Sequence, residues 1–385
     1  MKILSTMKWF FSLLILTSSS LSGATPDKKM SEVSRVIEER FSVKPTDNFE
    51  LINKYGDVII NTWDVDSVKI NVEILAFGKD YSDARKTLER VFIDLDQTGS
   101  YLVAETTFDR SSSLFQEFFN TLSDDSRAMM SKGKIEVNYT VFMPSTLSLT
   151  LENKFGDVFL MELNGKAQIS VLHGNLRTNN INSNSIIDAG FGDVRIKYLK
   201  SGRITLRAAE GDIQQVGIVE LRSTGSDIDV RKAERIRMDS RSDRSIKIHQ
   251  IEHLSGKGMF SKLTIEELGN TIDLTMDYGE LMVRNVPFNF SEINITSRFS
   301  DIYLALNPLS YLNVEIEARE DKLMIPMAFD RLERYYIDEK RKEVRLTGNV
   351  GAPNNFSANL TVRSKNADVT IHFVDDANDG QSATK

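Results

Sequence analysis

Basic side chains concentrate in one stretch of the sequence, between Arg222 and Lys247. Five acidic residues lie among eight basic ones, so three cations are in excess. Arginine forks suit carboxylate and phosphate groups, which makes this stretch a candidate surface for an acidic glycan or an envelope protein. A solvated face of alternating charges is the alternative. The eight basic residues are Arg222, Arg231, Lys232, Arg235, Arg237, Arg241, Arg244 and Lys247.

Acidic residues recur along the chain at similar spacing, and two kinds of chemistry could use them. A row of aspartates could bind calcium, but calcium-binding repeats need several glycines and a nine-residue period, which this chain lacks. We therefore expect each aspartate to close its own turn. Paired carboxylates could also cleave a polysaccharide. The candidate ridge is Asp57, Asp157, Asp193, Asp212, Asp227 and Asp301, and the candidate pairs come from Glu210, Asp212, Asp227 and Asp229.

The sequence contains few side chains of the kinds that bind metals or cofactors. There are no cysteines and four histidines. His249 and His253 are four residues apart, a metal-binding spacing on a helix, but they fall in sequence typical of strands. We predict no metal site, no catalytic residues and no cofactor. An aromatic stripe (Phe115, Phe118 and Phe119) could meet a membrane or a partner helix, but packing onto the end of the fold is the favoured interpretation.

The chain has 385 residues and a formal net charge of −7, a balance unlike that of a dedicated nucleic-acid binder. Residues 1–24 resemble a secretory signal. Lys2 and Lys8 precede the apolar run 9–16, and Ala24 ends a small-residue cleavage motif. The run is too short to span a bilayer. We expect an exported protein, in the periplasm or at the cell surface or outside it, that folds without disulfides.

A Gly-Asp turn repeats through the sequence. Residues 53–58 (Asn-Lys-Tyr-Gly-Asp-Val) return almost unchanged at 153–158, and shorter versions follow. The clearest turns are Gly56-Asp57, Gly156-Asp157, Gly192-Asp193 and Gly279-Glu280. With the acidic residue as position 0, the repeat is about 18 residues long. Equivalent positions are Asp157, Asn175, Asp193, Asp212, Asp227, Ser245, Lys262, Glu280, Asp301, Lys322 and Asp368.

Apolar residues alternate around position 0, which is the period of a strand with one buried face. Branched aliphatic residues recur one and three positions after it and six before it. The glycine would turn the backbone with positive φ, and the aspartate would form an Asx-turn. Each unit would be two or three short strands that bury their inner face only by stacking. The sequence predicts an all-β fold, a right-handed parallel β-solenoid (β-helix) over residues 142–374.

The regions before and after the repeats, and one insertion among them, have other patterns. Residues 25–141 contain the first Gly-Asp turn and read as a strand over 68–77, a helix over 80–95 and a strand over 101–108. We predict that this region is an N-terminal α/β cap. Residues 330–355 are a charged insertion before the final repeat, predicted to be a C-terminal cap. Residues 375–385 are predicted to be a disordered tail.

The chain resembles the bacterial "putative adhesin" family, a domain of unknown function related to the heads called GIN. The resemblance rests on the Asn-Lys-Tyr-Gly-Asp-Val turn, the strand 137–144, Gly348-Asn349 and the closing segment 359–371. Ser245 and Lys262 depart from it, since the acidic turn residue is missing there. The resemblance implies an exported envelope protein with a β-solenoid, no established activity and no catalytic residues to carry over.

Two functions remain open from the sequence. The first is a non-enzymatic cell-envelope protein, an adhesin-like binding or structural module that presents a repetitive surface to a glycan or protein partner. The alternative is a carbohydrate-active enzyme, a lyase or hydrolase, on the same fold. An enzyme would need a cleft with convergent carboxylates of perturbed pKa.

Overall fold

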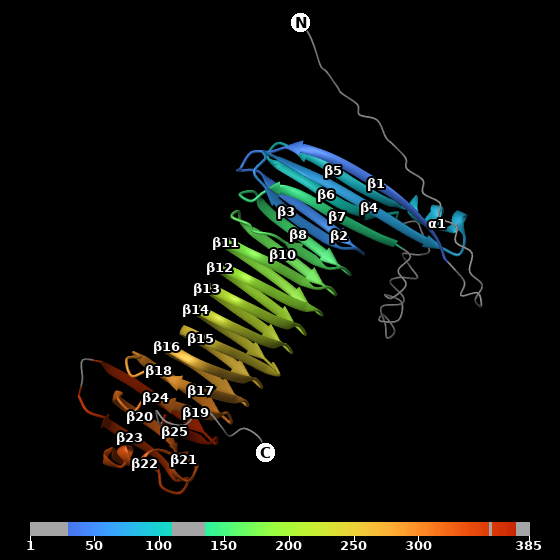
Figure 1. Ribbon diagram of the computed structural model, residues 1–385. Coiled ribbons are helices and arrows are strands. Elements are labelled where there is room, and N and C mark those ends of the chain that lie inside the picture. Colours follow the sequence, from blue (N-terminus) through green and yellow to red (C-terminus); the bar gives the residue numbers. More distant parts are fainter. Residues whose placement is uncertain (1–29, 110–134, 354–355, 375–385) are drawn as a thin grey trace, which may run out of the picture.

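The computed structural model describes residues 30–109, 135–353 and 356–374 (Figure 1). These residues form one long sheet of 25 strands, in which most neighbours run parallel. One α-helix and two short 3-10 helices complete their secondary structure. The all-β prediction and the parallel stacking are therefore confirmed for this part of the chain.

Several predictions concern residues outside those ranges. They are the signal segment 1–24, the stripe of Phe115, Phe118 and Phe119, and the tail 375–385. Within the described ranges, no helix has the length and apolar character that crossing a membrane requires.

Six long parallel strands form the middle of the molecule (Figure 1). Asp193 lies opposite Glu210, so the chain returns to its starting point after each repeat. Every repeat is therefore one turn of a flattened coil, called a rung below. Its first limb (193–199) and second limb (201–207) lie on opposite sides and bury side chains between them. The six strands are β11 (Leu176–Gly190), β12 (Asp193–Arg207), β13 (Glu210–Thr224), β14 (Asp227–Arg241), β15 (Ser245–Met259) and β16 (Lys262–Asp277).

The inner columns of the rungs match the sequence pattern. The aliphatic side chains one and three residues after position 0 and six before it are buried, except for Leu323 and Ile325, which are half-buried. Three residues that interrupt the aliphatic pattern are not buried: Gln215 is exposed, and Asp239 and Gly256 are half-buried. The predicted short strands differ in one respect: in these six rungs the two limbs form a single strand with a bend. The buried columns include Val158, Leu176, Val194, Ile228, Ile246, Leu263, Leu281 and Ile302, then Ile196, Val230, Ile248 and Ile265, then Leu151, Ile169, Ile187, Leu221, Leu274 and Ile295.

One rung is aligned differently from the prediction. Position 0 after Asp193 belongs to Glu210, not to Asp212, which lies two residues further along the strand. The next residue is then Gly211 instead of an aliphatic residue. Leu206 fills the space inside, because a Cβ built on Gly211 would lie 3.0 Å from its Cδ1 atom. The Leu206 side chain therefore occupies the space that an aliphatic residue at position 211 would fill.

The N-terminal region joins the same sheet. β2 lies between β6 and β8, and β3 lies between β7 and β9, all parallel. β1 pairs antiparallel with β4, β4 with β7, and β5 with β6. These elements are β1 (Ser31–Ser42), β2 (Asn48–Lys54), β3 (Val58–Trp63), β4 (Ser67–Gly78), α1 (Tyr81–Leu88), β5 (Val91–Thr98), β6 (Tyr101–Phe108), β7 (Ile135–Pro144), β8 (Ser148–Lys154), β9 (Val158–Leu160) and β10 (Ala167–Leu172).

The helix predicted over 80–95 is shorter in the structure. It begins at Tyr81, after an N-cap in which the Asp80 carboxylate accepts a hydrogen bond from the backbone of Asp83, and it ends at Leu88. Residues 91–98 form β5 instead. The sequence Val-Phe-Ile-Asp-Leu-Asp alternates with the period of a strand, and pairing with β6 outweighs the helical spacing of its apolar residues.

The C-terminal region breaks the sequential order of the rungs. β24 lies between β18 and β20, and β25 lies between β19 and β21. The final repeat was expected to stack last, yet it lies between two earlier ones (Figure 1). The elements are β17 (Glu280–Val286), β18 (Glu292–Arg298), β19 (Asp301–Leu306), β20 (Tyr311–Arg319), η1 (Glu320–Lys322), β21 (Leu323–Met324), η2 (Met327–Arg331), β22 (Glu333–Asp338), β23 (Glu343–Val350), β24 (Ser357–Lys365) and β25 (Val369–Phe373).

Candidate functional site

The aspartates at position 0 link neighbouring rungs. The Asp57 carboxylate accepts a hydrogen bond from the backbone N–H of Asp157 at 2.8 Å. Asp157 accepts in the same way from Asn175 at 2.8 Å, and Asn175 from Asp193 at 2.9 Å. The predicted Asx-turns are therefore wrong at these rungs, because each side chain bonds to the next rung instead of to its own turn. Among the described residues, no group of three or more acidic or histidine side chains is arranged to hold a metal ion.

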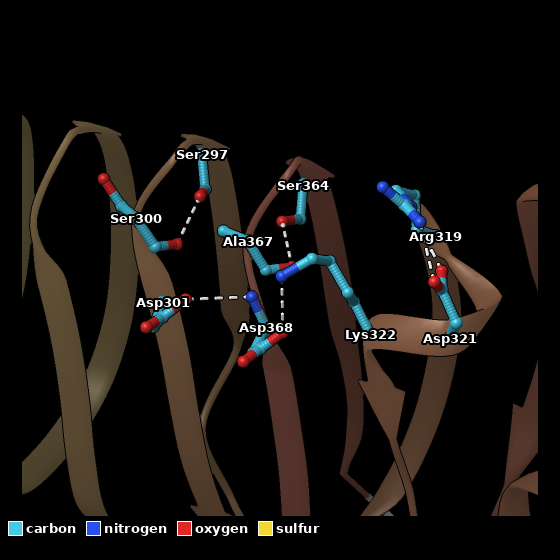
Figure 2. Close-up of polar contacts among 9 residues, drawn as sticks. All are labelled: Ser297, Ser300, Asp301, Arg319, Asp321, Lys322, Ser364, Ala367 and Asp368. Atoms are coloured by element: carbon cyan, nitrogen blue, oxygen red, sulfur yellow. Dashed lines mark hydrogen bonds and ion pairs between the residues drawn. The ribbon is translucent and has the colours of Figure 1, made fainter. Parts of the chain in front are cut away.

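The same link recurs near the C-terminal end (Figure 2). Asp301 Oδ1 accepts from the backbone N–H of Asp368 at 2.9 Å. Asp368 Oδ1 in turn lies 2.9 Å from the ammonium group of Lys322. The lysine at position 0 therefore ends this short row as a donor, whereas Asp301 and Asp368 act as acceptors.

The recurring shape of the turn does not come from a glycine with positive φ. Gly56, Gly156 and Gly192 lack positive φ, whereas the residue before each has it: Tyr55 at 67° and Phe155 at 62°, for example. The glycine is required for space, because a Cβ on Gly156 would overlap the backbone carbonyl oxygen of Gly56 in the adjacent rung. The predicted reason for these glycines is therefore wrong. Gly279, beside Glu280, is restricted in the same way by the backbone of Ser261.

Seven of the described residues with positive φ form two aromatic ladders, which the sequence reasoning missed. In the first ladder the rings of Tyr55, Phe155, His173 and Phe191 stack with centroid separations of 5.4, 5.0 and 4.7 Å. In the second, Phe260, Tyr278 and Phe299 stack at 5.0 Å each. An aromatic residue two positions before position 0 was the available signal. Between the ladders, the equivalent positions hold Ala208, Gly225 and Ser242.

A buried carboxylate holds the turns together where the aromatic rings are missing. Asp243 is only 2% exposed. It accepts hydrogen bonds from the hydroxyl groups of Ser223 and Ser240, at 2.5 and 2.6 Å, and from the backbone of Ser226 at 2.8 Å. Three donors offset the cost of burying its charge. In the sequence, this turn differs from the neighbouring turns by one additional residue.

The basic stretch does not form one surface. β14 carries five of its residues at different places around a single rung. Arg231 lies on the first limb, Lys232 and Arg235 flank the bend, and Arg237 and Arg241 lie on the second limb. Arg222 is on the second limb of β13, Arg244 is in the next turn, and Lys247 is on the first limb of β15. The structure therefore brings together only Arg222, Arg237 and Arg241.

These three arginines line a shallow cleft of about 490 Å³ on the second limbs of β13 to β16. Lys257 is its fourth basic residue, and three acidic residues also line it. The lining residues are Glu220, Arg222, Arg237, Met238, Asp239, Ser240, Arg241, Gly256, Lys257, Gly258, Met259, Thr275 and Asp277.

Each acidic residue of the cleft already has a basic partner. Glu220 accepts from Arg203 at 2.8 Å and from Arg222 at 2.6 Å, and these hydrogen bonds lower the pKa of its carboxyl group. Asp277 accepts from Arg298, which lowers the pKa of Asp277 in the same way. Both carboxylates therefore stay charged well into the acidic range.

The remaining acid, Asp239, lies 3.3 Å from the Lys257 ammonium. No carboxylate of the cleft is then left for Arg237 and Arg241. In the described part of the chain, neither of these two guanidinium groups has an ion pair or a side-chain hydrogen bond. They lie on the same outer face of β14, on either side of Asp239. The cleft thus presents two unmatched cations to solvent.

The other candidate residues lie elsewhere. Asp212 and Asp229 face each other on the first limbs of adjacent rungs, as do Glu210 and Asp227 at the turn edge. Asp229 also lies 3.0 Å from the Nε2 atom of His249. This pairing takes place outside the cleft.

The two histidines do not converge. His249 contacts Asp229, whereas the Nδ1 atom of His253 lies 2.9 Å from the Thr271 hydroxyl group near the bend. The structure therefore places the two imidazoles against different partners on different parts of the rung.

No protein-family model and no curated protein matches this chain. It is similar to the crystal structure of a "putative adhesin" from Bacteroides fragilis, with 10% identity over 88% of this chain and 97% of that one and a TM-score of 0.27. A "putative adhesin" from Parabacteroides distasonis is 11% identical over 71% and 93%, with a TM-score of 0.28. A "putative cell adhesion protein" from Clostridium sporogenes is 7% identical over 88% and 100%, with a TM-score of 0.18. The first two structures carry the description of the family that the sequence motifs resemble.

Proposed function

We propose that the protein is an adhesin-like, non-enzymatic binding module of the cell envelope, and that its cleft binds an acidic glycan. The observation that carries this proposal is the pair Arg237 and Arg241, which face the cleft without a carboxylate partner. Two like charges on one strand repel each other, and an anionic ligand removes that cost. Guanidinium groups also bind carboxylates with two parallel hydrogen bonds.

The proposal includes the address and the architecture that the sequence predicts. Residues 1–24 direct export to the periplasm or the cell surface, and the rungs form a right-handed β-solenoid. The antiparallel strands β1 and β5 at one end, and the hairpin β22–β23 at the other, act as caps. The assignment of these strands as caps is supported by their pairing, because antiparallel strands pair with the outer rungs at both ends. Open parallel edges there would otherwise pair with strands of other chains.

The test is binding of polygalacturonate by the purified chain, measured by calorimetry at low and at high salt. We expect binding that weakens as salt is added, because the contacts are exposed ion pairs. Replacing Arg237 and Arg241 together by serine should weaken binding at low salt by about tenfold, since an exposed ion pair contributes up to about 1 kcal/mol and two such pairs are lost.

The matched control removes two exposed cations from the first limb, Arg195 and Arg231, on the opposite side of the rungs. This double serine variant should bind as the wild type does. Equal losses in both variants would show attraction by overall charge instead of a site. Shortening of the polymer during incubation would instead support the carbohydrate-active enzyme.

A further inference from the structure

The second aromatic ladder ends with an uncovered ring face. Phe260 stacks on Tyr278 at 5.0 Å on one side and is 57% exposed. On its other side the ladder position belongs to Ser242, whose backbone N–H donates to the carbonyl of Met259 at 2.8 Å. The turn of Ser242 therefore lies directly beside that of Phe260, but it provides no ring.

This free face adjoins the cleft. Arg241 precedes Ser242 and Met259 precedes Phe260, and both Arg241 and Met259 line the cleft. The first ladder also ends on a free face, at Phe191, which is 54% exposed. There, however, the adjoining ring-less position is Ala208, and Arg207, the residue before it, already pairs with Asp188. The far end of the second ladder differs as well, because the cation beside Phe299 is Lys365, which does not line the cleft. Among the described ladder ends, only the Phe260 side combines a free ring with unmatched arginines of the cleft.

The two features call for one ligand with two kinds of group. The face of an aromatic ring is negative, so it attracts C–H groups and repels carboxylates. Arg237 and Arg241 require the carboxylates. A sugar acid carries both, with C–H groups on the face of its ring and a carboxylate at its rim. The cleft spans the second limbs of four strands, which suits several linked rings better than one.

We infer that the cleft takes an oligosaccharide of sugar acids, one ring of which packs on the free face of Phe260 while its carboxylates bind Arg241 and Arg237. This inference rests on the proposed function and adds the ring contact to it. It assigns Phe260 a binding role that Tyr278 does not share, because Tyr278 is covered by rings on both sides.

The decisive variant is Ser242→Phe, which covers the face instead of removing it. Ser242 has φ of 53°, the same as Phe260, so its backbone already has the conformation of a ladder aromatic. The added ring should stack on Phe260 and exclude the sugar. Asn366→Phe is the matched control, because Asn366 has φ of 58° and follows Phe299 at the far end of the same ladder.

Affinity for tetragalacturonate is measured by calorimetry, and thermal midpoints check that both variants are folded. We expect Ser242→Phe to raise Kd by about tenfold or more, and Asn366→Phe to change it by less than about twofold. Phe260→Ser, which removes the ring, should weaken binding as Ser242→Phe does. Tripolyphosphate, which has charge without rings, and cellotetraose, which has rings without charge, should both bind more weakly than tetragalacturonate.

The two proposals fail in different ways. If tripolyphosphate binds as tightly as tetragalacturonate and Ser242→Phe changes neither, the ring contact is wrong while an anion-binding cleft remains. If none of the anionic probes binds, or binding does not depend on Arg237 and Arg241, both proposals are wrong.

Discussion

The ammonium group of Lys322 lies 2.9 Å from Oδ1 of Asp368, and the backbone N–H of Asp368 donates to Asp301 (Figure 2). Asp368 is the last of these three residues in the sequence, yet it lies between the other two in space. Turns that look alike in the sequence are thus interleaved in the fold. The hydrogen bonds between these side chains therefore identify which rungs are neighbours, whereas the order of the sequence does not.

Side chains inside the rungs should dominate stability. Ile196 is 1% exposed, whereas Ile186 on the preceding rung faces outward and is 40% exposed. Ile196→Ala should lower the free energy of unfolding by about 2–5 kcal/mol, because it leaves a cavity. Ile186→Ala removes the same atoms from a solvated face and should cost well under half as much. Urea titrations of both variants test this, and equal midpoint shifts would contradict the inner and outer assignment.

The links between rungs should contribute about as much as ordinary hydrogen bonds. Asp157→Ala removes the acceptor of the Asn175 backbone N–H and of its side-chain amide, and should cost about 1 kcal/mol. Asp157→Asn keeps an oxygen at Oδ1 and should retain most of the stability. The same denaturant titration compares them. A loss for asparagine as large as that for alanine would show that the charge matters instead of the acceptor.

The buried Asp243 should be far more sensitive. Asp243→Ala leaves two hydroxyl groups and one backbone N–H without their acceptor, and should cost about 3 kcal/mol. Asp239→Ala, four residues earlier on the outer face, loses only a half-exposed ion pair and should cost less than about 1 kcal/mol. Thermal unfolding followed by circular dichroism separates the two, and similar midpoints would refute the role of Asp243.

Acid should weaken one specific pair. Hydrogen bonds from Arg298 lower the pKa of Asp277 below its ordinary value of 3.8. A lowered folded-state pKa stabilises the fold above pH 3.8, and this contribution is lost as the pH falls through the lower folded value. Arg298→Gln should therefore be less stable than the wild type at pH 6, and the difference should shrink below pH 3.8. Midpoints measured across this range test the pair, and a constant difference would exclude it.

The repeat determined most of what the sequence could predict. Aliphatic columns such as Val194 and Ile196 are set by burial, and burial depends on the alternation that the sequence shows directly. The sequence pattern places Asp212 at position 0, whereas the structure places Glu210 there. The sequence could not show this, because Leu206 fills the space beside Gly211 only in the folded chain. The sequence shows the glycine of each turn, but the close approach of the adjacent rung that requires it is a tertiary contact.

The cleft was less accessible to sequence reasoning. Counting charges between Arg222 and Lys247 found the basic residues, but it could not tell which had partners. Arg222 shares Glu220 with Arg203, and Lys247 pairs with Glu266, so neither is free. The unmatched state of Arg237 and Arg241 depends on pairs with residues outside the stretch, such as Asp277 with Arg298.

The interleaved position of β24 and β25 constrains the order in which the chain can fold. Rungs that stack in sequence order can be added one after another, each docking on a neighbour already present. β20 and β21 cannot do this on β18 and β19, because the strands between them come later in the chain. This end of the molecule must close a long loop before its native contacts form. During synthesis, which begins at the N-terminus, the middle rungs can therefore form first. The C-terminal end can form only after residues 357–373 have been made.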